Sequence, residues 1–187
     1  NRGYNVTVCN TGGHIEECQR YFKILAEKQV DGIILIGSIF NQLAGYPEIL
    51  AQVKGIPVVV ANGHVDSPDF YSVLVDDVKA IRTVVDYLYD KGRKELVYVF
   101  DLETDSGRAK RQGFLEGMKL KDIPNAKERM FKSAYGLEGG MKAADDIIRS
   151  GIPFTGIICG EDVTAIGVMK ELKKRGYRIP EDVAVTG

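Results

Sequence analysis

Residues 156–176 read Gly156-Ile-Ile-Cys-Gly-Glu-Asp-Val-Thr-Ala-Ile-Gly-Val-Met-Lys-Glu-Leu-Lys-Lys-Arg-Gly176. The first four are small or apolar without strict alternation, which is typical of a parallel strand covered on both faces. A stripe of apolar residues at helical spacing follows: Val163, Ile166, Met169 and Leu172. Gly176 comes directly after a basic last turn, where a glycine commonly ends a helix. This stretch therefore predicts a strand that runs into a helix.

The same unit repeats along the chain. Further helical stripes are Ile15, Cys18, Phe22, Leu25 and Ala26, and then Val78, Ile81, Val85 and Leu88. The candidate strands are Val6–Cys9, Gly32–Ile36, Val58–Ala61, Val73–Val75, Leu96–Phe100, Arg129–Lys132, Gly156–Cys159 and Val183–Val185. Repeated strand–helix–strand units predict an α/β fold with parallel sheets.

A polar, turn-rich segment interrupts this alternation. It runs from Asn62 to Tyr71, and we interpret the strand after it, Val73–Val75, as the connection between two lobes. Asp76 or Asp77 would then cap the next helix. The predicted domains are an N-terminal lobe of residues 1–75 and a C-terminal lobe of residues 76–187.

Composition favours an ordinary globular protein. The 187 residues can bury one good core or two small ones, and 44% are hydrophobic and 27% charged. The 25 basic and 26 acidic side chains leave a formal charge of -1, with no Lys/Arg block. The chain therefore lacks the basic surface that DNA binding requires. If the protein regulates a gene, its DNA-reading part lies outside these residues.

The cysteines and the apolar runs indicate a compartment. Cys9, Cys18 and Cys159 lie in apolar segments without metal-ligand spacing, which favours small buried side chains in a reducing compartment over a reactive thiol. No signal peptide is visible, and no apolar run nears the roughly 20 residues of a membrane helix. We expect a cytoplasmic protein with no membrane partner.

Three further stretches of the sequence carry recognisable patterns. Ile-Pro-Glu-Asp-Val-Ala-Val-Thr-Gly occupies 179–187, Asn-Arg-Gly-Tyr-Asn-Val-Thr-Val-Cys-Asn-Thr occupies 1–11, and Val-Asp-Gly-Ile-Ile-Leu-Ile-Gly-Ser occupies 30–38. These stretches resemble, in the expected order, the effector-binding core of the lactose-repressor (LacI/GalR) family of transcriptional regulators. The resemblance covers essentially the whole chain.

The resemblance implies a periplasmic-binding-protein-like (Venus-flytrap) fold. Two Rossmann-like lobes would face each other across a cleft, truncated here at both ends. The family's first strand would precede Asn1 and lie between the next two strands. Without it, Val6–Cys9 and Gly32–Ile36 would present unpaired edges. We therefore expect that residues 1–187 are part of a longer chain and are not independently stable.

Two motifs supply candidate site residues. Residues 106–114 read Ser-Gly-Arg-Ala-Lys-Arg-Gln-Gly-Phe and resemble the family's Ser-x-Arg-x-Arg-x-x-Gly-Phe/Tyr. By this match Lys110 takes the place of an effector-gripping arginine, although lysine lacks the planar fork. Residues 161–167 read Glu-Asp-Val-Thr-Ala-Ile-Gly and resemble Asn-Asp-x-x-Ala-x-Gly. The match implies that Asp162 caps a helix and that Glu161 accepts ligand hydroxyls or pairs with Lys110.

Ligands of open parallel sheets bind where the strands end. Strand-end positions and the two motifs together give the candidate ligand-binding residues, which are Ser38, Asn62, Ser106, Arg108, Lys110, Tyr135 and Glu161. Their donors, acceptors and aromatic ring suit a polyol. Five of them have a structural alternative: Arg108 and Lys110 in a solvated first turn, Ser38 and Asn62 as turn residues, and Tyr135 as a partly buried core ring.

Catalysis is not indicated. No Ser/His/Asp or Cys/His set can be assembled, and neither a metal site nor a cofactor motif appears. Asp101, Glu103 and Asp105 cluster after a strand, which is more typical of a solvated loop than of acid–base groups. We expect no enzyme, although an α/β enzyme acting on a nucleotide or sugar phosphate is the third hypothesis.

The leading hypothesis is a sugar-sensing domain of a LacI-type regulator. Binding of a carbohydrate effector in the cleft would shift the DNA-binding state. Operator DNA would be read by a helix-turn-helix absent from this chain, and the resemblance implies a homodimer. Purines are the main alternative effectors. The alternative function is a periplasmic sugar-binding protein of an ABC transporter.

Overall fold

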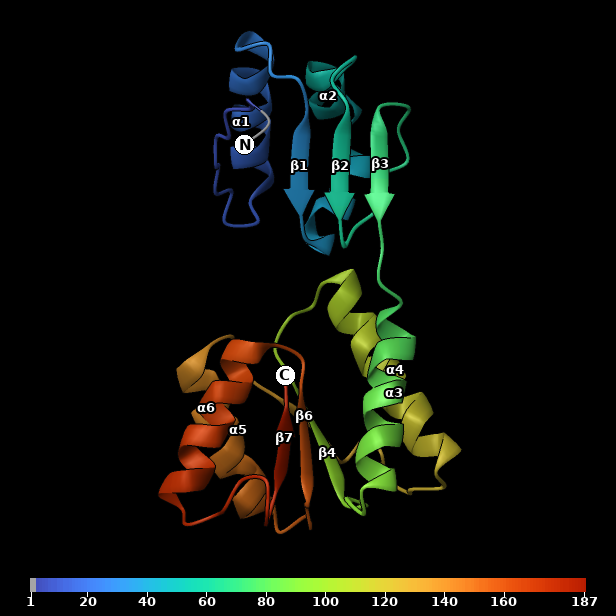
Figure 1. The fold of residues 1–187 in the computed structure, drawn as a ribbon, viewed down its shortest axis with the longest axis vertical. Helices are drawn as coiled ribbons and strands as arrows, with labels where there is room; N and C mark the ends of the chain where they lie inside the picture. Colours follow the sequence, from blue (N-terminus) through green and yellow to red (C-terminus); the bar gives the residue numbers. More distant parts are fainter. Residues whose placement is uncertain (1–2) are drawn as a thin grey trace. The chain divides into compact units, whose positions relative to one another are not determined.

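The computed structural model describes residues 3–187, which form two compact units divided between Val75 and Asp76 (Figure 1). Each unit contains its own parallel sheet and its own hydrophobic core. The predicted α/β class with two parallel sheets is therefore confirmed.

The first unit builds its core on one face of a three-stranded sheet. Its elements are α1 (Ile15–Glu27), β1 (Ile33–Ile36), the 3₁₀ helix η1 (Ser38–Gly45), α2 (Pro47–Leu50), the 3₁₀ helix η2 (Ala51–Val53), β2 (Val58–Ala61) and β3 (Phe70–Val73). The strands lie in the order β1-β2-β3 and are all parallel. Cys18 and Phe22 of α1 pack with Ile33 and Leu35 of β1, so helix and strand share one core.

The opposite face of β1 is exposed. Ile34 and Ile36 alternate with the buried positions and are 72% and 77% exposed. In β3, Tyr71 and Val73 are exposed as well. Since alternate residues of a strand point to opposite faces, the exposure of Ile34 and Ile36 follows from the burial of Ile33 and Leu35.

The prediction of a strand at Val6–Cys9 is wrong. Residues 4–11 have no regular secondary structure, and Val6 and Val8 are 85% and 89% exposed. Their apolar, β-branched sequence favours a strand, but a strand also requires a neighbour that completes its hydrogen bonds. Among residues 3–187, β1 pairs with β2 alone. No described strand therefore flanks Val6–Cys9.

The strand predicted at Val73–Val75 begins earlier, at Phe70. Phe70 packs against the core and pairs with Val58, whereas Leu74 and Val75 leave the sheet and are exposed. The preceding polar residues made 70–71 resemble part of a turn. The other predicted strands agree with the structure to within one residue at each end.

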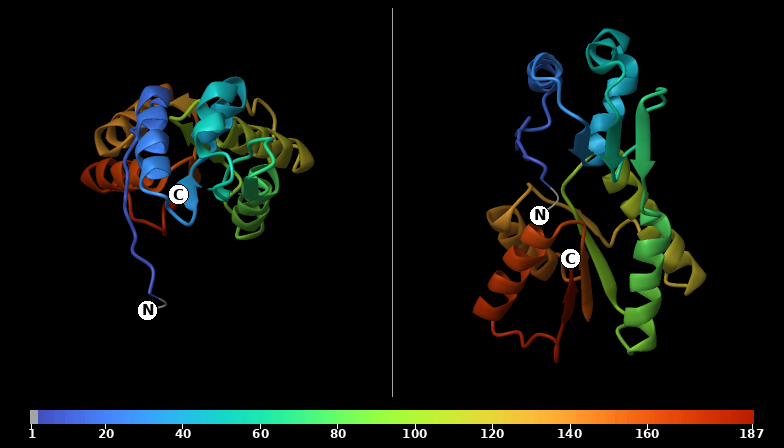
Figure 2. Two further views of the ribbon diagram at one scale, coloured as in Figure 1. Left: turned by 90° about the horizontal axis from the view of Figure 1, so that it is seen from above. Right: turned by 45° about the horizontal axis from the view of Figure 1, so that its top comes forward.

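The second unit is a sheet covered on both faces. Its elements are α3 (Asp77–Asp90), β4 (Leu96–Phe100), α4 (Asp105–Leu120), β5 (Met130–Lys132), α5 (Leu137–Ser150), β6 (Gly156–Cys159), α6 (Asp162–Lys174) and β7 (Ala184–Thr186). Both figures show α3 and α4 on one side of the sheet and α5 and α6 on the other (Figures 1 and 2). Alternate residues of β4 supply the two cores: Leu96 and Tyr98 face α3 and α4, and Val97 and Val99 face α5 and α6.

The strand order of this sheet creates a switch point. The parallel strands lie in the order β5-β4-β6-β7, so the chain leaves β4 toward β5 and then returns to the other side of β4. The connections diverge at the carboxyl ends of β4 and β6. In open α/β sheets this divergence opens a crevice for ligands.

Helix ends follow local sequence rules. Asp76 caps α3, because its side chain accepts a hydrogen bond from the backbone N–H of Lys79 at 2.9 Å. Gly151, Gly92 and Gly176 adopt positive φ angles of 70°, 84° and 88° at helix C-termini. The predictions for Asp76 and Gly176 are confirmed, and the three glycines explain why α3, α5 and α6 stop where they do.

Two glycines allow α5 and α6 to pack closely. A Cβ at Gly167 would lie 2.1 Å from the carbonyl oxygen of Leu137, and one at Gly140 would lie 2.1 Å from that of Thr164. Both distances are shorter than any real contact. The backbones of the two helices therefore touch where these residues face each other.

We expect Gly167→Ala to destabilise the second unit. The methyl group gains helix propensity but forces α5 and α6 apart, and such overpacking costs about 1–3 kcal/mol of unfolding free energy. Urea denaturation followed by circular dichroism measures the change. Lys170→Ala, on the exposed face of the same helix, is the control; equal stability of both variants would contradict the packing argument.

An ion pair links two residues of the loop before β7. The guanidinium of Arg178 donates to both carboxylate oxygens of Asp182, at 3.0 and 2.6 Å, and its backbone N–H donates to one of them at 2.8 Å. These hydrogen bonds lower the pKa of Asp182 from 3.8 to about 2. The carboxylate form is therefore favoured in the folded state.

The stability that Asp182 contributes should depend on pH. A depressed folded-state pKa gives stability that is present above the unfolded pKa of 3.8 and lost as pH falls through about 2. We expect Asp182→Asn to lower the urea midpoint at neutral pH, and the difference from wild type to shrink between about pH 4 and pH 2. Glu181→Gln, at the exposed neighbour, is the control. A difference that does not change with pH would argue against this pairing.

Candidate functional site

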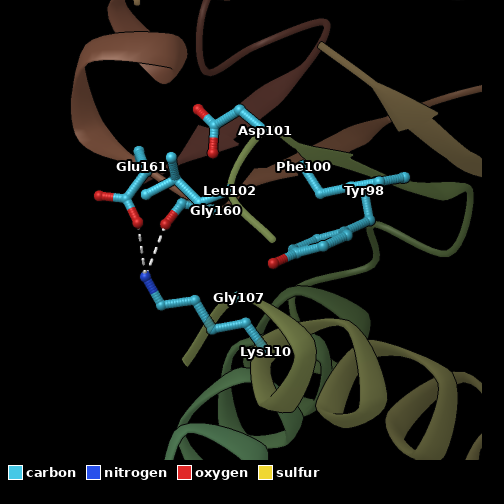
Figure 3. Close-up of a pocket in the computed structure, with 8 residues that line it drawn as sticks. All are labelled: Tyr98, Phe100, Asp101, Leu102, Gly107, Lys110, Gly160 and Glu161. Carbon is cyan, nitrogen blue, oxygen red and sulfur yellow. Dashed lines mark hydrogen bonds and ion pairs between the residues drawn. The ribbon is translucent and has the colours of Figure 1, made fainter. Parts of the chain in front are cut away.

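A polar hollow lies at the carboxyl ends of β4 and β6, at the switch point of the second sheet (Figure 3). About 170 Å³ of space in and around it is not filled by protein atoms, and the hollow is partly open to solvent. The lining residues are Tyr98, Phe100, Asp101, Leu102, Gly107, Lys110, Gly160 and Glu161.

The start of α4 forms one wall. Thr104 caps this helix, with its hydroxyl accepting a hydrogen bond from the backbone N–H of Gly107 at 3.1 Å. A Cβ at Gly107 would lie 2.3 Å from the carbonyl oxygen of Leu102, so only glycine allows the helix to turn this tightly out of the strand. This turn places Lys110 over the hollow.

Lys110 joins the two walls. Its ammonium group donates to the carbonyl oxygen of Gly160 at 2.7 Å and contacts a carboxylate oxygen of Glu161 at 3.1 Å (Figure 3). The side chains are 21% and 34% exposed. At this exposure the ion pair contributes little stability, about 0–1 kcal/mol. It leaves one N–H of Lys110 and one oxygen of Glu161 without a partner in this pair, and both can serve a ligand.

Asp101 is fixed from the opposite side. It follows β4, and its carboxylate accepts a hydrogen bond from the hydroxyl of Thr164 at 2.5 Å. Thr164 is fully buried in α6. The hollow thus contains two carboxylates, those of Asp101 and Glu161, and one ammonium group, that of Lys110.

The side chain of Tyr98 forms the floor of the hollow. Its ring is buried and stacks on Phe114 of α4 with a centroid distance of 5.2 Å. The hydroxyl has no hydrogen-bond partner among residues 3–187. Burial raises the pKa of this phenol strongly, and the negative charge of Asp101 raises it further. The group therefore remains a neutral hydroxyl.

The cations beside Lys110 serve the helix start. The Arg111 guanidinium donates to Glu103 at 2.7 Å and lies 4.8 Å from the centroid of the Phe100 ring. This hydrogen bond lowers the pKa of Glu103. Arg108 contacts Asp105 and donates to the backbone carbonyl of Glu103 at 2.6 Å.

Two of the predicted site residues meet. Lys110 and Glu161 form the predicted pair, whereas Ser106 and Arg108 lie on the same helix but do not line the hollow. Tyr135 is 62% exposed, which excludes the partly buried core ring. Ser38 begins η1, and Asn62 follows β2 with a φ of 58°, as in a tight turn. Both belong to the first unit.

One local prediction is wrong. Asp162 does not cap α6, because the cap position is Glu161, whose side chain makes no capping hydrogen bond. Asp162 lies in the first turn, where a negative charge still favours the N-terminal end of the helix dipole. The backbone of Glu161 is extended, and its carboxylate is directed to Lys110 instead.

Sequence reasoning missed Tyr98 as a site residue. Positions within an apolar strand are assigned to the core, and the ring of Tyr98 does lie there. The available signal was a phenol in an otherwise apolar run, Leu96-Val-Tyr-Val-Phe100, two residues before the strand ends. Buried tyrosine hydroxyls usually have a partner, so such a position is worth examining.

The acidic residues after β4 do not form a free acid–base set. Asp101 accepts from Thr164, Glu103 contacts Arg111 and Lys132, and Asp105 contacts Arg108. Within the described residues, no group of three or more His, Cys, Asp or Glu side chains is placed to hold a metal ion. Nor is any helix in residues 3–187 long and apolar enough to cross a membrane.

Two of the three cysteines are buried. Burial raises the pKa of the Cys18 thiol to about 11 and that of the Cys159 thiol to about 12. Both are therefore protonated and poor nucleophiles at neutral pH. Cys9 is partly exposed.

Known proteins are similar in sequence to this chain along its whole length. A regulator with a helix-turn-helix from Lachnoclostridium phytofermentans is 29% identical over 187 residues, 99% of this chain and 56% of that protein. The PurR transcriptional repressor of Photorhabdus laumondii is 29% identical over 189 residues, 100% of this chain and 54% of the repressor. The chain thus spans about half the length of these relatives.

Solved structures share the fold. An uncharacterised protein from Actinobacillus succinogenes superposes with a TM-score of 0.83 at 27% identity, over 99% of this chain and 68% of that one. A LacI-family transcriptional regulator from Lactobacillus casei with bound sucrose gives a TM-score of 0.80 at 25% identity, over 99% and 68%. The same regulator has also been solved with bound glucose.

The family model that describes periplasmic binding proteins and the sugar binding domain of the LacI family matches residues 1–187. This match, the regulators that align along the chain and the shared fold all indicate the same family. The chain belongs to the family of periplasmic binding proteins and LacI-type sugar-binding domains.

Proposed function

We propose that this chain is the effector-sensing domain of a LacI-type transcriptional regulator and that its effector is a carbohydrate. The single observation that carries the proposal is the polar hollow at the switch point of a family member, where the carboxyl ends of β4 and β6 bring Lys110 and Glu161 together. Sucrose and glucose, which a relative from Lactobacillus casei binds, are the first candidates.

The chemistry of the hollow supports a polyol. The remaining N–H of Lys110 donates, and the second oxygen of Glu161 accepts, so neighbouring hydroxyls of one sugar satisfy both. The charges of the pair cancel, so it neither attracts nor repels a neutral ligand strongly. A purine base is the competing effector, because its edge also alternates donors and acceptors.

Effector binding would act by a population shift. A ligand that binds one of two conformations more tightly favours that conformation, and the DNA affinity of the whole protein changes with it. The DNA contact is assigned to a helix-turn-helix outside these residues, because the formal charge of this chain is only -1. A homodimer, cytoplasmic location and roles for Ser38, Asn62, Ser106, Arg108 and Tyr135 belong to the same proposal.

A transport protein that delivers sugars is the second candidate, because the family description covers both classes. The curated relatives favour the regulator, since those named above are transcriptional regulators. Gel-shift assays of the intact protein with the DNA upstream of its own gene distinguish the two. Sugar-dependent DNA binding supports the regulator, and sugar binding without any DNA binding supports the transport protein.

We expect Lys110→Ala and Glu161→Ala to weaken effector binding in the intact protein by about 1–3 kcal/mol each, because each removes a charge-assisted hydrogen bond to the ligand. Isothermal titration with the sugar that most raises the melting temperature, chosen from a panel with glucose, sucrose and purine bases, measures the loss.

The matched control is Lys142→Ala. Lys142 also pairs with a carboxylate, Asp146, at 2.6 Å, but on the exposed surface of α5 and outside the hollow. Its loss should leave the titration unchanged. Wild-type affinity in both hollow variants would refute the assignment of Lys110 and Glu161, while leaving the family and the fold untouched.

A further inference from the structure

The buried hydroxyl of Tyr98 has no structural role that the described residues reveal. Its side chain is fully buried, and the hydroxyl makes no hydrogen bond within residues 3–187. It is directed into the hollow, toward the side that carries Lys110 and Gly160 (Figure 3). A buried hydroxyl without a partner is unfavourable, and in folded proteins most such groups are satisfied. Phenylalanine would fill the same space without this cost.

Gly160 places no side chain beside the buried Tyr98 hydroxyl, at the edge of the hollow. A Cβ at this residue would lie 3.4 Å from the Tyr98 hydroxyl oxygen and 3.8 Å from a carboxylate oxygen of Asp101. Both are ordinary contacts, so the backbone does not require glycine for lack of space. A side chain here would nevertheless stand between the phenol and a ligand. The bare glycine and the unpartnered hydroxyl are thus two observations at one point.

We propose that the Tyr98 hydroxyl is a specificity-determining group that hydrogen-bonds an uncharged hydroxyl of the effector at the floor of the hollow. This inference rests on the proposed function and adds the chemistry that the floor selects. Tyr98 is a binding residue in this account, and Gly160 contributes by placing no side chain between the hydroxyl and the ligand.

The charges around Tyr98 favour a neutral hydroxyl over a phosphate. The ammonium group of Lys110 is balanced by Glu161, and Asp101 adds a second carboxylate. A sugar hydroxyl accepts from the phenol and donates to a carboxylate oxygen, whereas a phosphate has mainly acceptors and meets like charge. Glucose should therefore bind this floor better than glucose 6-phosphate if its phosphate has to enter the hollow.

A fixed water molecule is the rival explanation. Buried waters bridge polar groups that otherwise lack partners, and the loss of such a bridge destabilises the fold. The two accounts predict opposite results for one isosteric substitution, Tyr98→Phe. If the hydroxyl serves the ligand, its removal lowers affinity and leaves the free protein as stable or more stable. If it serves the fold through water, its removal lowers stability and leaves affinity unchanged.

The experiment uses the intact protein with Tyr98→Phe and, as control, Tyr87→Phe at an exposed phenol of α3. The probe is the sugar that most stabilises the wild type among glucose, sucrose and their relatives. We expect Tyr98→Phe to weaken binding about tenfold without lowering the melting temperature of the free protein, and Tyr87→Phe to change neither.

Gly160→Ala tests the same contact independently. Its Cβ fits, so the fold should persist, but it should weaken sugar binding by covering the phenol. In a Tyr98→Phe background the same change should have a smaller effect, because the hydroxyl is already gone. Purely additive losses in the double variant would overturn the proposed contact.

The remaining outcomes separate this inference from the proposed function. Wild-type affinity in Tyr98→Phe overturns the role of the phenol, while sugar binding by the wild type still supports the sensor. A lower melting temperature with unchanged affinity assigns the hydroxyl to the fold. Tighter binding of glucose 6-phosphate than of glucose, lost in Tyr98→Phe, overturns the selection for a neutral hydroxyl. If no sugar binds the wild type, the proposed function fails and this inference fails with it.

Discussion

The parallel pairing of β4 with β6 is the constraint on which the site depends. Leu96 pairs with Gly156 and Val99 with Cys159, so both strands end side by side while their connections leave in opposite directions. The loops after the two strands therefore face one hollow. Residues about 50 positions apart, Lys110 and Gly160, come within hydrogen-bond distance because of this register. The side chains make the hollow polar, but the backbone pairing of β4 with β6 determines where it forms.

Glycines lie where backbone segments of the second unit come closest together, and they allow the helices beside the site to pack. Gly107 lets α4 begin immediately after the loop that follows β4, and Gly140 and Gly167 bring α5 against α6. In the second unit, helices packed on both faces of the sheet support the ends of β4 and β6. Local order of this kind is what a binding group needs, since a displaced donor loses a directional hydrogen bond. Under the proposed function, packing far from the ligand would therefore determine how precisely the ligand is held.

Much of the fold follows from sequence patterns, and the exceptions have physical reasons. Gly156–Cys159 and Leu96–Phe100 are short apolar runs between helices, and both form strands with the predicted bounds. Val6–Cys9 has the same character but lacks a neighbour, which no local pattern reports. The motif match implied that Glu161 either accepts ligand hydroxyls or pairs with Lys110, and the structure shows the pair. Tyr98 was not predicted as a site residue, because periodicity shows that a side chain points inward but not whether its polar atom finds a partner.

Lysine at position 110 changes how the hollow selects. A guanidinium would grip two oxygens in one plane, whereas the ammonium of Lys110 is a point charge that Glu161 and the Gly160 carbonyl already hold. These two contacts hold the ammonium group in place, so one N–H remains for a ligand. Under the proposed function, selection between ligands would then depend more on neutral groups that line the hollow. The floor of the hollow offers a neutral group in Tyr98, whose buried ring stacks on Phe114. Under the proposed function, we expect such a site to select a ligand by the positions of its hydroxyls more than by its charge.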